Sequence, residues 1–397
     1  MESELSAMNE AYAHLIALVP PPGTLAIDWD RILGSELSPY LNSMSKIMQN
    51  PRWHEEGDVL SHTKMVCENL IKLKEWQTLG RSEQEALFIA ALLHDIGKIT
   101  STRTESETLT SAYHSVIGDR MTRTILWKDF GLSGTQESQQ FRETVCCLVR
   151  YHSSPVYLYT NESPERRAIS LAAHTELVFR YTNELLYVLE KADILGRIAE
   201  DTSEQLENLE LFKEVSLEAG CFNQPVRFPD PFSRYAYLSG RNILPGQELY
   251  NDTWGTVILM VGLPGTGKDA YIQEHFPNMP VISLDALREE MNASPVGSQR
   301  ETVNAARELA KGYLRQKQAF VWNATNIKPS LREKQISLFK QYKAMVKLVF
   351  LETSWEEMLR RNKNRKDTVP EPAIIKMLEK LVPPNLNEAH EVEWTIV

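Results

Sequence analysis

The hydrophobic positions of this chain follow two patterns, which change near residue 245. From residue 51 to about residue 218 they recur at helical spacing, as in SHTKMVCENLIKLKEW and SEQEALFIAALLHDIGK, and no long alternating strand pattern appears. A stretch rich in Pro, Gly and aromatic residues follows between residues 222 and 253 and is typical of a connector. We therefore expect an all-helical N-terminal domain that, with its connector, covers residues 1–245.

Beyond the connector, short apolar runs alternate with amphipathic segments. The runs are TVILMVGL, PVISLD, QAFVWNAT and VKLVFLE. Strands that alternate with helices are typical of an α/β domain with a parallel sheet. The sequence therefore predicts a multidomain protein, in which an all-α helical bundle is followed by an α/β domain over residues 246–397.

Charge and cysteine content narrow the possible partners and the compartment. Up to residue 254, 36 acidic residues outnumber 23 basic ones, whereas the remainder has 20 basic and 17 acidic residues. Affinity for a phosphate backbone depends largely on Lys and Arg, so a nucleic acid would be bound weakly and at its end. The apolar runs are much shorter than the roughly 20 residues of a membrane span, and MESELSAMNE does not resemble a signal peptide. With four cysteines and no CxxC spacing, we expect a cytoplasmic protein without a membrane partner or structural zinc.

The segment GLPGTGK follows the first strand predicted in the second domain and begins a helix, as a phosphate-binding loop does. Its glycines allow backbone N–H groups to surround phosphate oxygens, and Lys268 supplies a positive charge. Asp269 stands where the pattern has Ser or Thr, and a carboxylate can bind Mg²⁺ directly or through water. The predicted site for ATP and Mg²⁺ consists of Gly262, Pro264, Gly265, Thr266, Gly267, Lys268 and Asp269.

Two further motifs are placed to act on a transferring phosphoryl group. The second strand ends in SLD, so Asp285 can accept the proton of an attacking hydroxyl, and Arg288 lies one helical turn later. After the fourth strand, Arg361 and Arg365 share a helical face that can close over the phosphates. The competing interpretations are a helix N-cap for Asp285 and a solvated basic helix for the later arginines. No hydrophobic run ends in Asp-Glu, which argues against a mechanical ATPase.

These motifs resemble the kinase domain of phage-type 5′-OH polynucleotide kinases, and the likeness covers roughly residues 257–367. The resemblance implies that Asp285 is the general base on the 5′-OH and that Arg288 contacts the nearest phosphate of the acceptor. It also implies that the transferring group is stabilised by Lys268, Arg365 and, as the weaker choice, Arg361. Small-molecule kinases share this plan, so the identity of the acceptor stays open.

Histidine and aspartate residues recur on helical segments of the N-terminal domain in the order H…HD…D, which is that of the HD phosphohydrolases. Two more histidines lie between the HD pair and the late Asp and suit a second metal, with Asp95 as the bridge. We predict one or two divalent transition metals of the Mn²⁺, Co²⁺ or Ni²⁺ class, held by His62, His94, Asp95, His114, His152 and Asp193.

Two basic residues share a helical face with proposed ligands. Lys98 lies three residues after Asp95, and Arg197 lies four after Asp193, so each can neutralise a bound phosphate or is merely a surface charge. The metals would activate water for hydrolysis of a phosphomonoester or a cyclic phosphodiester. The other histidines, His54 among them, fall outside the ligand pattern and are expected to have no role in the chemistry.

The order of the two domains resembles the bacterial HD-Pnk end-healing enzymes over residues 62–367. This resemblance implies that the HD domain removes 2′,3′-cyclic, 2′ or 3′ phosphates from RNA or DNA ends, and that the kinase phosphorylates 5′-OH ends, which suits a nucleic-acid ligase. It implies that the phosphoesterase residues are His62, His94, Asp95, Lys98, His114, His152, Asp193 and Arg197. Two alternatives stay open: a nucleotide-salvage enzyme with a 5′-nucleotidase and a nucleoside or small-metabolite kinase, and a nucleotide sensor whose P-loop regulates the HD domain.

Overall fold

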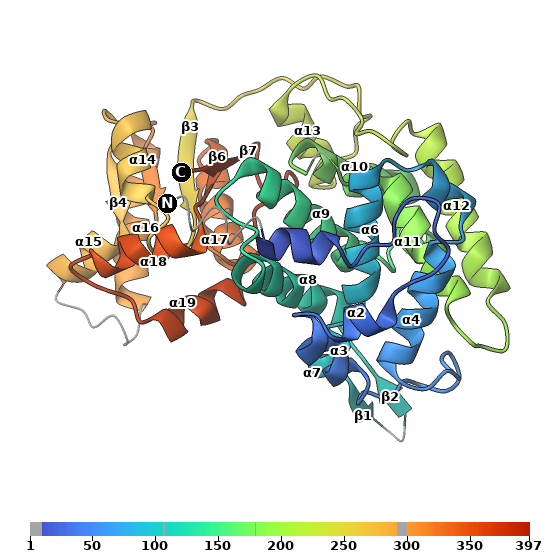
Figure 1. Cartoon of the computed structure of the whole chain (residues 1–397). Coiled ribbons are helices and arrows are strands. Elements are labelled where there is room, and N and C mark those ends of the chain that lie inside the picture. The colour runs from blue at the N-terminus through green and yellow to red at the C-terminus, as the bar shows by residue number, and fades with distance from the viewer. Residues whose placement is uncertain (1–9, 106–107, 179, 292–299) are drawn as a thin grey trace. The chain divides into compact units, whose positions relative to one another are not determined.

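The computed structural model describes residues 10–105, 108–178, 180–291 and 300–397 (Figure 1). The chain divides into two compact units, Met1–Val226 and Arg227–Val397. The first unit is helical, as predicted. Its α-helices are α2 (Trp29–Leu33), α3 (Ser38–Met44), α4 (Val59–Leu70), α5 (Lys74–Thr78), α6 (Arg81–Leu93), α7 (Lys98–Ser101), α8 (His114–Thr124), α9 (Gln136–Tyr151), α10 (Pro164–Ala172), α11 (Asn183–Leu195) and α12 (Ser203–Glu218). Short turns of other helix types are η1 (Ile125–Asp129), η2 (Leu158–Thr160) and η3 (Ala173–Glu176).

Helix α6 is the centre of the first unit. Residues 86–93 are completely buried and uniformly apolar, as expected of a helix that is covered on all sides. It contacts α4, α9 and α11. Its start is set by Glu83, whose carboxylate accepts the N–H of Gly80 at 2.7 Å. Because α6 ends at the middle of the bundle, the next two residues, His94 and Asp95, are buried there.

The first unit also contains a small antiparallel hairpin, which the sequence analysis did not predict. Strand β1 (Arg103–Glu105) pairs with β2 (Thr108–Thr110). Strands of three residues are too short to show a period of two in the sequence. The hairpin leaves the helical character of the unit unchanged.

The boundary between the units lies earlier in the chain than the predicted join near residue 245. Residues 227–245, expected to belong to the first domain as a connector, include α13 (Pro231–Leu238), which is part of the second unit. There Arg234 donates to the carbonyl of His390 at 2.9 Å, and Lys340 donates to the hydroxyl of Tyr235 at 2.7 Å. These partners lie more than a hundred residues away, which is why a local pattern of Pro, Gly and aromatic residues suggested only a connector.

The second unit is built on a five-stranded parallel sheet of order β4-β5-β3-β6-β7, which confirms the predicted α/β class. Figure 1 shows its helices around the sheet. The strands are β3 (Thr256–Val261), β4 (Val281–Ser283), β5 (Val321–Asn323), β6 (Met345–Glu352) and β7 (Glu391–Ile396). The other helices are α14 (Lys268–His275), α15 (Leu284–Glu290), α16 (Arg300–Arg315), α17 (Pro329–Gln341), α18 (Trp355–Lys363) and α19 (Glu371–Leu378). Strand β7 was not predicted; it is half-buried along its length at the edge of the sheet and lacks a continuous apolar run.

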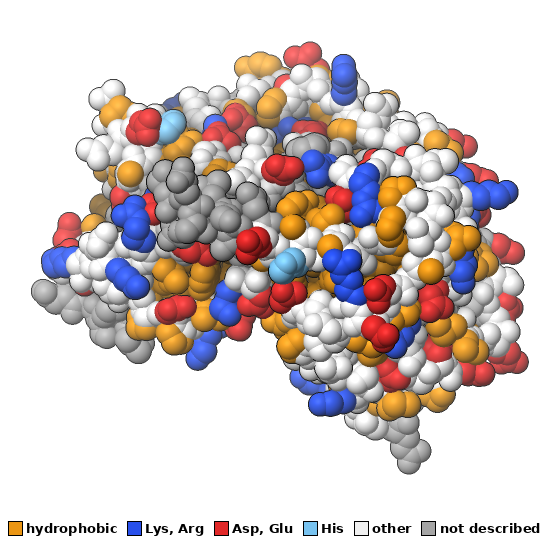
Figure 2. Space-filling model, viewed as in Figure 1, with side chains coloured by type: hydrophobic (Ala, Val, Ile, Leu, Met, Phe, Trp, Pro, Cys, Tyr) orange, Lys and Arg blue, Asp and Glu red, His pale blue; other side chains and the backbone are white. Residues whose placement is uncertain are grey.

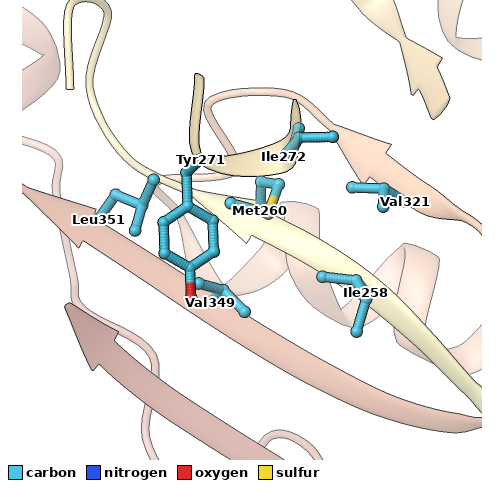
Figure 3. Close-up of a cluster of buried hydrophobic side chains, with 7 residues drawn as sticks. All are labelled: Ile258, Met260, Tyr271, Ile272, Val321, Val349 and Leu351. Atoms are coloured by element: carbon cyan, nitrogen blue, oxygen red, sulfur yellow. The ribbon is translucent and has the colours of Figure 1, made fainter. Parts of the chain in front are cut away.

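A cluster of buried side chains fixes helix α14 against the sheet (Figure 3). The helix contributes Tyr271 and Ile272, and strands β3, β5 and β6 contribute Ile258, Met260, Val321, Val349 and Leu351. Burying one such side chain contributes about 1.5–3 kcal/mol. This packing holds the first residue of α14, Lys268, at the carboxyl end of the central strand.

The surface mixes charges of both signs. On the face shown in Figure 2, Lys and Arg side chains of the described residues are interspersed with Asp and Glu. No helix among the described residues has the length and apolar character needed to cross a bilayer. The cysteines are free thiols, of which Cys67, Cys146 and Cys221 are buried, as expected for small apolar side chains.

Candidate functional site

The six residues predicted as metal ligands converge inside the first unit, although His62 and Asp193 lie 131 positions apart. They are contributed by α4 (His62), the end of α6 (His94 and Asp95), the start of α8 (His114), the end of α9 (His152) and α11 (Asp193). All except His114 are buried. The helical bundle therefore brings together side chains from five separate helices.

The six residues form two adjoining clusters. In the first, Nε2 of His62 lies 2.9 Å from Oδ1 of Asp193, and Nε2 of His94 lies 3.9 Å from the same oxygen. Asp95 belongs to the second cluster, with His114 and His152, and also approaches the first. Its Oδ2 lies 3.3 Å from Nε2 of His94, and its Oδ1 lies 3.5 Å from Nε2 of His114. Asp95 thus directs one oxygen to each cluster, as a bridging ligand would.

The hydrogen bonding of the rings tests whether these residues suit a metal. His94, His114 and His152 each hold Nδ1 2.8–3.0 Å from a backbone carbonyl oxygen, so the proton is on Nδ1 and the lone pair is on Nε2. Two such lone pairs, of His114 and His152, face each other across 3.3 Å. Nε2 of His94 and Oδ1 of Asp95 are buried and make no hydrogen bond within the described part of the chain. Ligand atoms about 2.1 Å from one cation lie about 3.0–3.4 Å apart, so the cluster fits divalent cations.

Lys98 and Arg197, the two basic residues predicted to neutralise a bound phosphate, both face this metal-ligand centre. Lys98 donates to Oδ2 of Asp95 at 2.6 Å, and Arg197 donates to Oδ2 of Asp193 at 2.6 Å. Burial opposes ionisation of Asp95, but the charge of Lys98 acts against it, and the pKa of Asp95 lies well below its usual range. Arg197 has the same effect on the pKa of Asp193, again against the effect of burial. Both carboxylates are therefore ionised and available as ligands.

Glu56 and His54 belong to the same centre, although sequence reasoning missed the first and set the second aside. Oε1 of Glu56 accepts hydrogen bonds from Nδ1 of His62 at 2.9 Å and from Nδ1 of His54 at 2.7 Å. The ring centroids of His54 and His62 are 4.7 Å apart. His54 was expected to have no role in the chemistry, and the structure places it beside the ligand His62. The only sequence signal was the short spacing of the three residues in HEEGDVLSH.

A cavity of about 1010 Å³ opens over the centre. Its walls include Asp95, His114, His152 and Asp193, together with both cations, Lys98 and Arg197. A phosphate ester in this cavity can therefore reach the ligand cluster and two positive charges at the same time.

In the second unit, the loop between β3 and α14 has the backbone geometry that phosphate binding requires. Gly265 and Gly267 have backbone φ angles of 85° and 83°, which residues other than glycine rarely adopt. A Cβ atom at Gly265 would lie 2.5 Å from the carbonyl of Met358, so only glycine fits there. The other predicted loop residues, Gly262, Pro264 and Thr266, are buried in the same turn. Lys268 lies across the loop and donates to the carbonyls of Gly262 at 3.0 Å and Leu263 at 2.8 Å.

The proposed acceptor residues gather beside this loop. Oδ1 of Asp285 accepts a hydrogen bond from Arg288 at 2.7 Å, and its Oδ2 accepts one from Arg365 at 3.2 Å. Burial opposes the ionisation of Asp285, but the two arginines hold the pKa of its carboxyl group below the usual value. Burial, with the charge of Arg365, lowers the pKa of Lys268 to about 8, while the charges of Asp269 and Asp285 oppose this shift. Lys268, Asp285 and Arg365 are thus close enough to influence one another.

Arg361 and Asp269 also lie at the loop. A Cβ atom built on Gly267 would be 2.8 Å from Nη1 of Arg361, whose Nε donates to Glu357 at 2.6 Å. Asp269 is exposed, and its Oδ1 accepts a hydrogen bond from the amide of Asn323, at the end of β5, at 2.6 Å. Sequence reasoning did not identify Asn323, because nothing local connects it with the loop. Its bond orients the carboxylate that replaces the usual hydroxyl.

Comparison with known proteins found a family model that matches part of each unit. A family model described as an HD domain matches residues 59–177, and one described as an AAA domain matches residues 257–384. The first match covers five of the six clustered residues and ends before Asp193. The second runs from the central strand past Arg365. No curated protein matches the chain.

Proposed function

We propose that this chain, an HD phosphohydrolase domain fused to a P-loop kinase-like domain, is an enzyme that heals the ends of nucleic-acid strands. The first domain would hydrolyse 2′,3′-cyclic, 2′ or 3′ phosphate ends. The second would transfer the γ-phosphate of ATP to 5′-OH ends. The products are ends that a nucleic-acid ligase can join.

The exposure of Asp285 is the observation that favours a polymeric acceptor over a small molecule. Its side chain is 66% exposed while it is held between Arg288 and Arg365. Kinases of small metabolites are expected to enclose the acceptor, because a closed pocket supplies specificity and excludes water. An open general base with two arginines instead suits the end of a longer strand. Arg288 can bind the nearest acceptor phosphate through its planar fork of donors.

The residues of the kinase-like domain have separate roles in phosphoryl transfer. The loop N–H groups and Lys268 hold the phosphates, for which Lys268 exchanges its carbonyl partners for phosphate oxygens. Asp285 accepts the proton of the attacking hydroxyl. Arg365 and Arg361 stabilise the charge of the transferring group. Asp269 would hold Mg²⁺, which would neutralise phosphate charge.

In the HD domain, the six clustered residues would hold one or two divalent cations. Such cations lower the pKa of bound water and polarise a phosphoryl oxygen. Lys98 and Arg197 bind the remaining phosphate oxygens and keep Asp95 and Asp193 ionised. Glu56 keeps the proton of His62 on Nδ1, so that Nε2 is the ligand atom.

Transfer of γ-labelled phosphate from ATP tests the proposal. A short 5′-OH oligonucleotide and a panel of nucleosides are compared in the presence of Mg²⁺, with Lys268→Ala as the inactive control. We expect label on the oligonucleotide. Label on nucleosides alone would replace the proposal by nucleotide salvage. ATP binding without transfer to either acceptor would replace it by nucleotide sensing.

A further inference from the structure

The cavity over the metal centre continues along the end of α9 and onto α10. There its walls include Arg150, in the last turn of α9, and Arg167, on α10. Lys98 and Arg197, at the metal centre, are the other Lys and Arg side chains among the described residues of its lining. We call Lys98 and Arg197 the first pair, and Arg150 and Arg167 the second pair, of basic residues in this cavity.

The second pair differs from the first because, among the residues that the structure describes, neither arginine forms an ion pair with a carboxylate. Nη1 of Arg150 is buried and makes no hydrogen bond within the described residues. The charge of Arg150 acts on Asp119, but Asp119 is bound to Arg123 at 2.7 Å. Arg167 donates only a long bond of 3.3 Å to the hydroxyl of Ser154 among the described residues. Lys98 and Arg197, in contrast, are bound to carboxylates of the metal centre.

This arrangement favours an anion at the second pair. Three described carboxylates line the cavity, and two of them, Asp95 and Asp193, belong to the metal centre; the third is Glu204. Half-buried guanidinium groups without a counter-charge are costly, and their planar forks match the oxygens of a phosphate. A phosphate diester would supply the missing acceptors.

Aromatic side chains line the same cavity. Trp53, Tyr113 and Tyr157 are 42%, 79% and 60% exposed, although large apolar groups are usually covered. Exposed aromatic rings beside positive charges are typical of sites on which unpaired bases stack. Pockets for a drug-sized ligand hold about 300–1,000 Å³, and this cavity, at about 1010 Å³, is slightly larger. It therefore has room for more than the terminal phosphate and its sugar.

We propose that Arg150 and Arg167 form a second phosphate site, which binds the diester that precedes the terminal phosphate held at the metal centre. The exposed rings stack the adjoining bases. This inference rests on the proposed end-healing function and deepens it, because it defines the substrate class of the HD domain. The substrate is a single-stranded end with at least one internal phosphate, in preference to a free nucleotide.

Three substrates with a 3′-phosphate test this proposal on the full-length, Mn²⁺-loaded protein. They are a nucleoside 3′-monophosphate, a dinucleotide, and the same dinucleotide with an uncharged methylphosphonate linkage. For the wild type, we expect kcat/KM on the charged dinucleotide to exceed that on the uncharged one by about ten-fold or more, as for loss of a charge-assisted hydrogen bond. This comparison needs no variant and is unaffected by misfolding.

Variants then locate the site. Arg150→Gln and Arg167→Gln should each reduce the ratio of kcat/KM for the charged dinucleotide to that for the mononucleotide by about ten-fold, mainly through KM. Arg166→Gln is the matched control, because Arg166 adjoins Arg167 on α10 but does not line the cavity. Its ratio should equal that of the wild type. Thermal unfolding of each preparation reports on folding.

The outcomes separate this proposal from the one on which it rests. If the wild type hydrolyses both dinucleotides equally well, or if the two arginine variants keep the wild-type ratio, there is no second phosphate site and end healing still stands. If the wild type hydrolyses none of the 3′-phosphate substrates and no 2′,3′-cyclic end, both the proposed function and this inference are refuted.

Discussion

Replacing Glu56 by Gln should weaken metal binding in the first unit. The side chain of Glu56 is 2% exposed, and its Oε1 accepts the Nδ1 protons of His62 and His54. Its Oε2 accepts the N–H of Ile198 at 2.9 Å. Glutamine has the same shape but no charge, and either orientation of its amide places NH₂ against an N–H donor. The carboxylate that makes Nε2 of His62 a stronger ligand is therefore lost.

The size of the effect follows from this role. Loss of a carboxylate that supports a ligand histidine typically costs 10–100-fold in metal affinity, or about 1.4–2.8 kcal/mol at 1.4 kcal/mol per factor of ten. The other proposed ligands do not contact Glu56 directly, so their contribution should remain. We expect the concentration of Mn²⁺ that gives half-maximal phosphoesterase activity to rise by about 10–100-fold.

The assay is a Mn²⁺ titration of phosphoester hydrolysis, with direct binding of Mn²⁺ measured by calorimetry. Glu55→Gln is the matched control, because Glu55 adjoins Glu56 but its residue is exposed and its backbone, not its side chain, bonds to Ile198. Kinase activity should be the same in both variants. Equal Mn²⁺ affinity in the folded Glu56→Gln and Glu55→Gln proteins would refute the role given to Glu56.

Asp95→Ala should abolish phosphoester hydrolysis and leave the kinase active, whereas Lys268→Ala should do the reverse; loss of both activities in one folded variant would contradict two independent sites. Asp285→Asn should lower the kcat of phosphoryl transfer about 10²–10⁴-fold, because it removes the general base, and should change ATP affinity, measured by calorimetry, far less. A weaker affinity with an unchanged kcat would reject that role. Burial lowers the pKa of His390 to about 4, and its Nδ1 accepts the N–H of Val346. Because this pKa lies below the unfolded value of about 6.5, the unfolded state binds the proton first as pH falls, and stability should drop by about 2 kcal/mol between pH 7 and pH 5. Thermal unfolding of the full chain should show a smaller acid-induced loss in His390→Gln; equal losses would exclude His390 as the cause.

Local patterns in the sequence determined the two domain types and most of the candidate residues. The strand–loop–helix context of GLPGTGK predicted the phosphate-binding loop, because glycine at two positive-φ positions is a local requirement. Helical periodicity predicted the first unit, and the alternation of apolar runs with helices predicted the parallel sheet. The order of His and Asp residues indicated which side chains to place together, but it contained no distances.

Tertiary structure alone decided which side chains support these residues. Glu56 binds His62, Asn323 binds Asp269, and Arg150 and Arg167 line one cavity with the metal centre. It also assigned residues 227–245 to the second unit and added β7 at the edge of the sheet. The reason is physical. The spacing of hydrophobic residues, helix caps and turns depend on neighbours within a few residues, whereas these contacts join distant segments that are brought together by packing of the whole core.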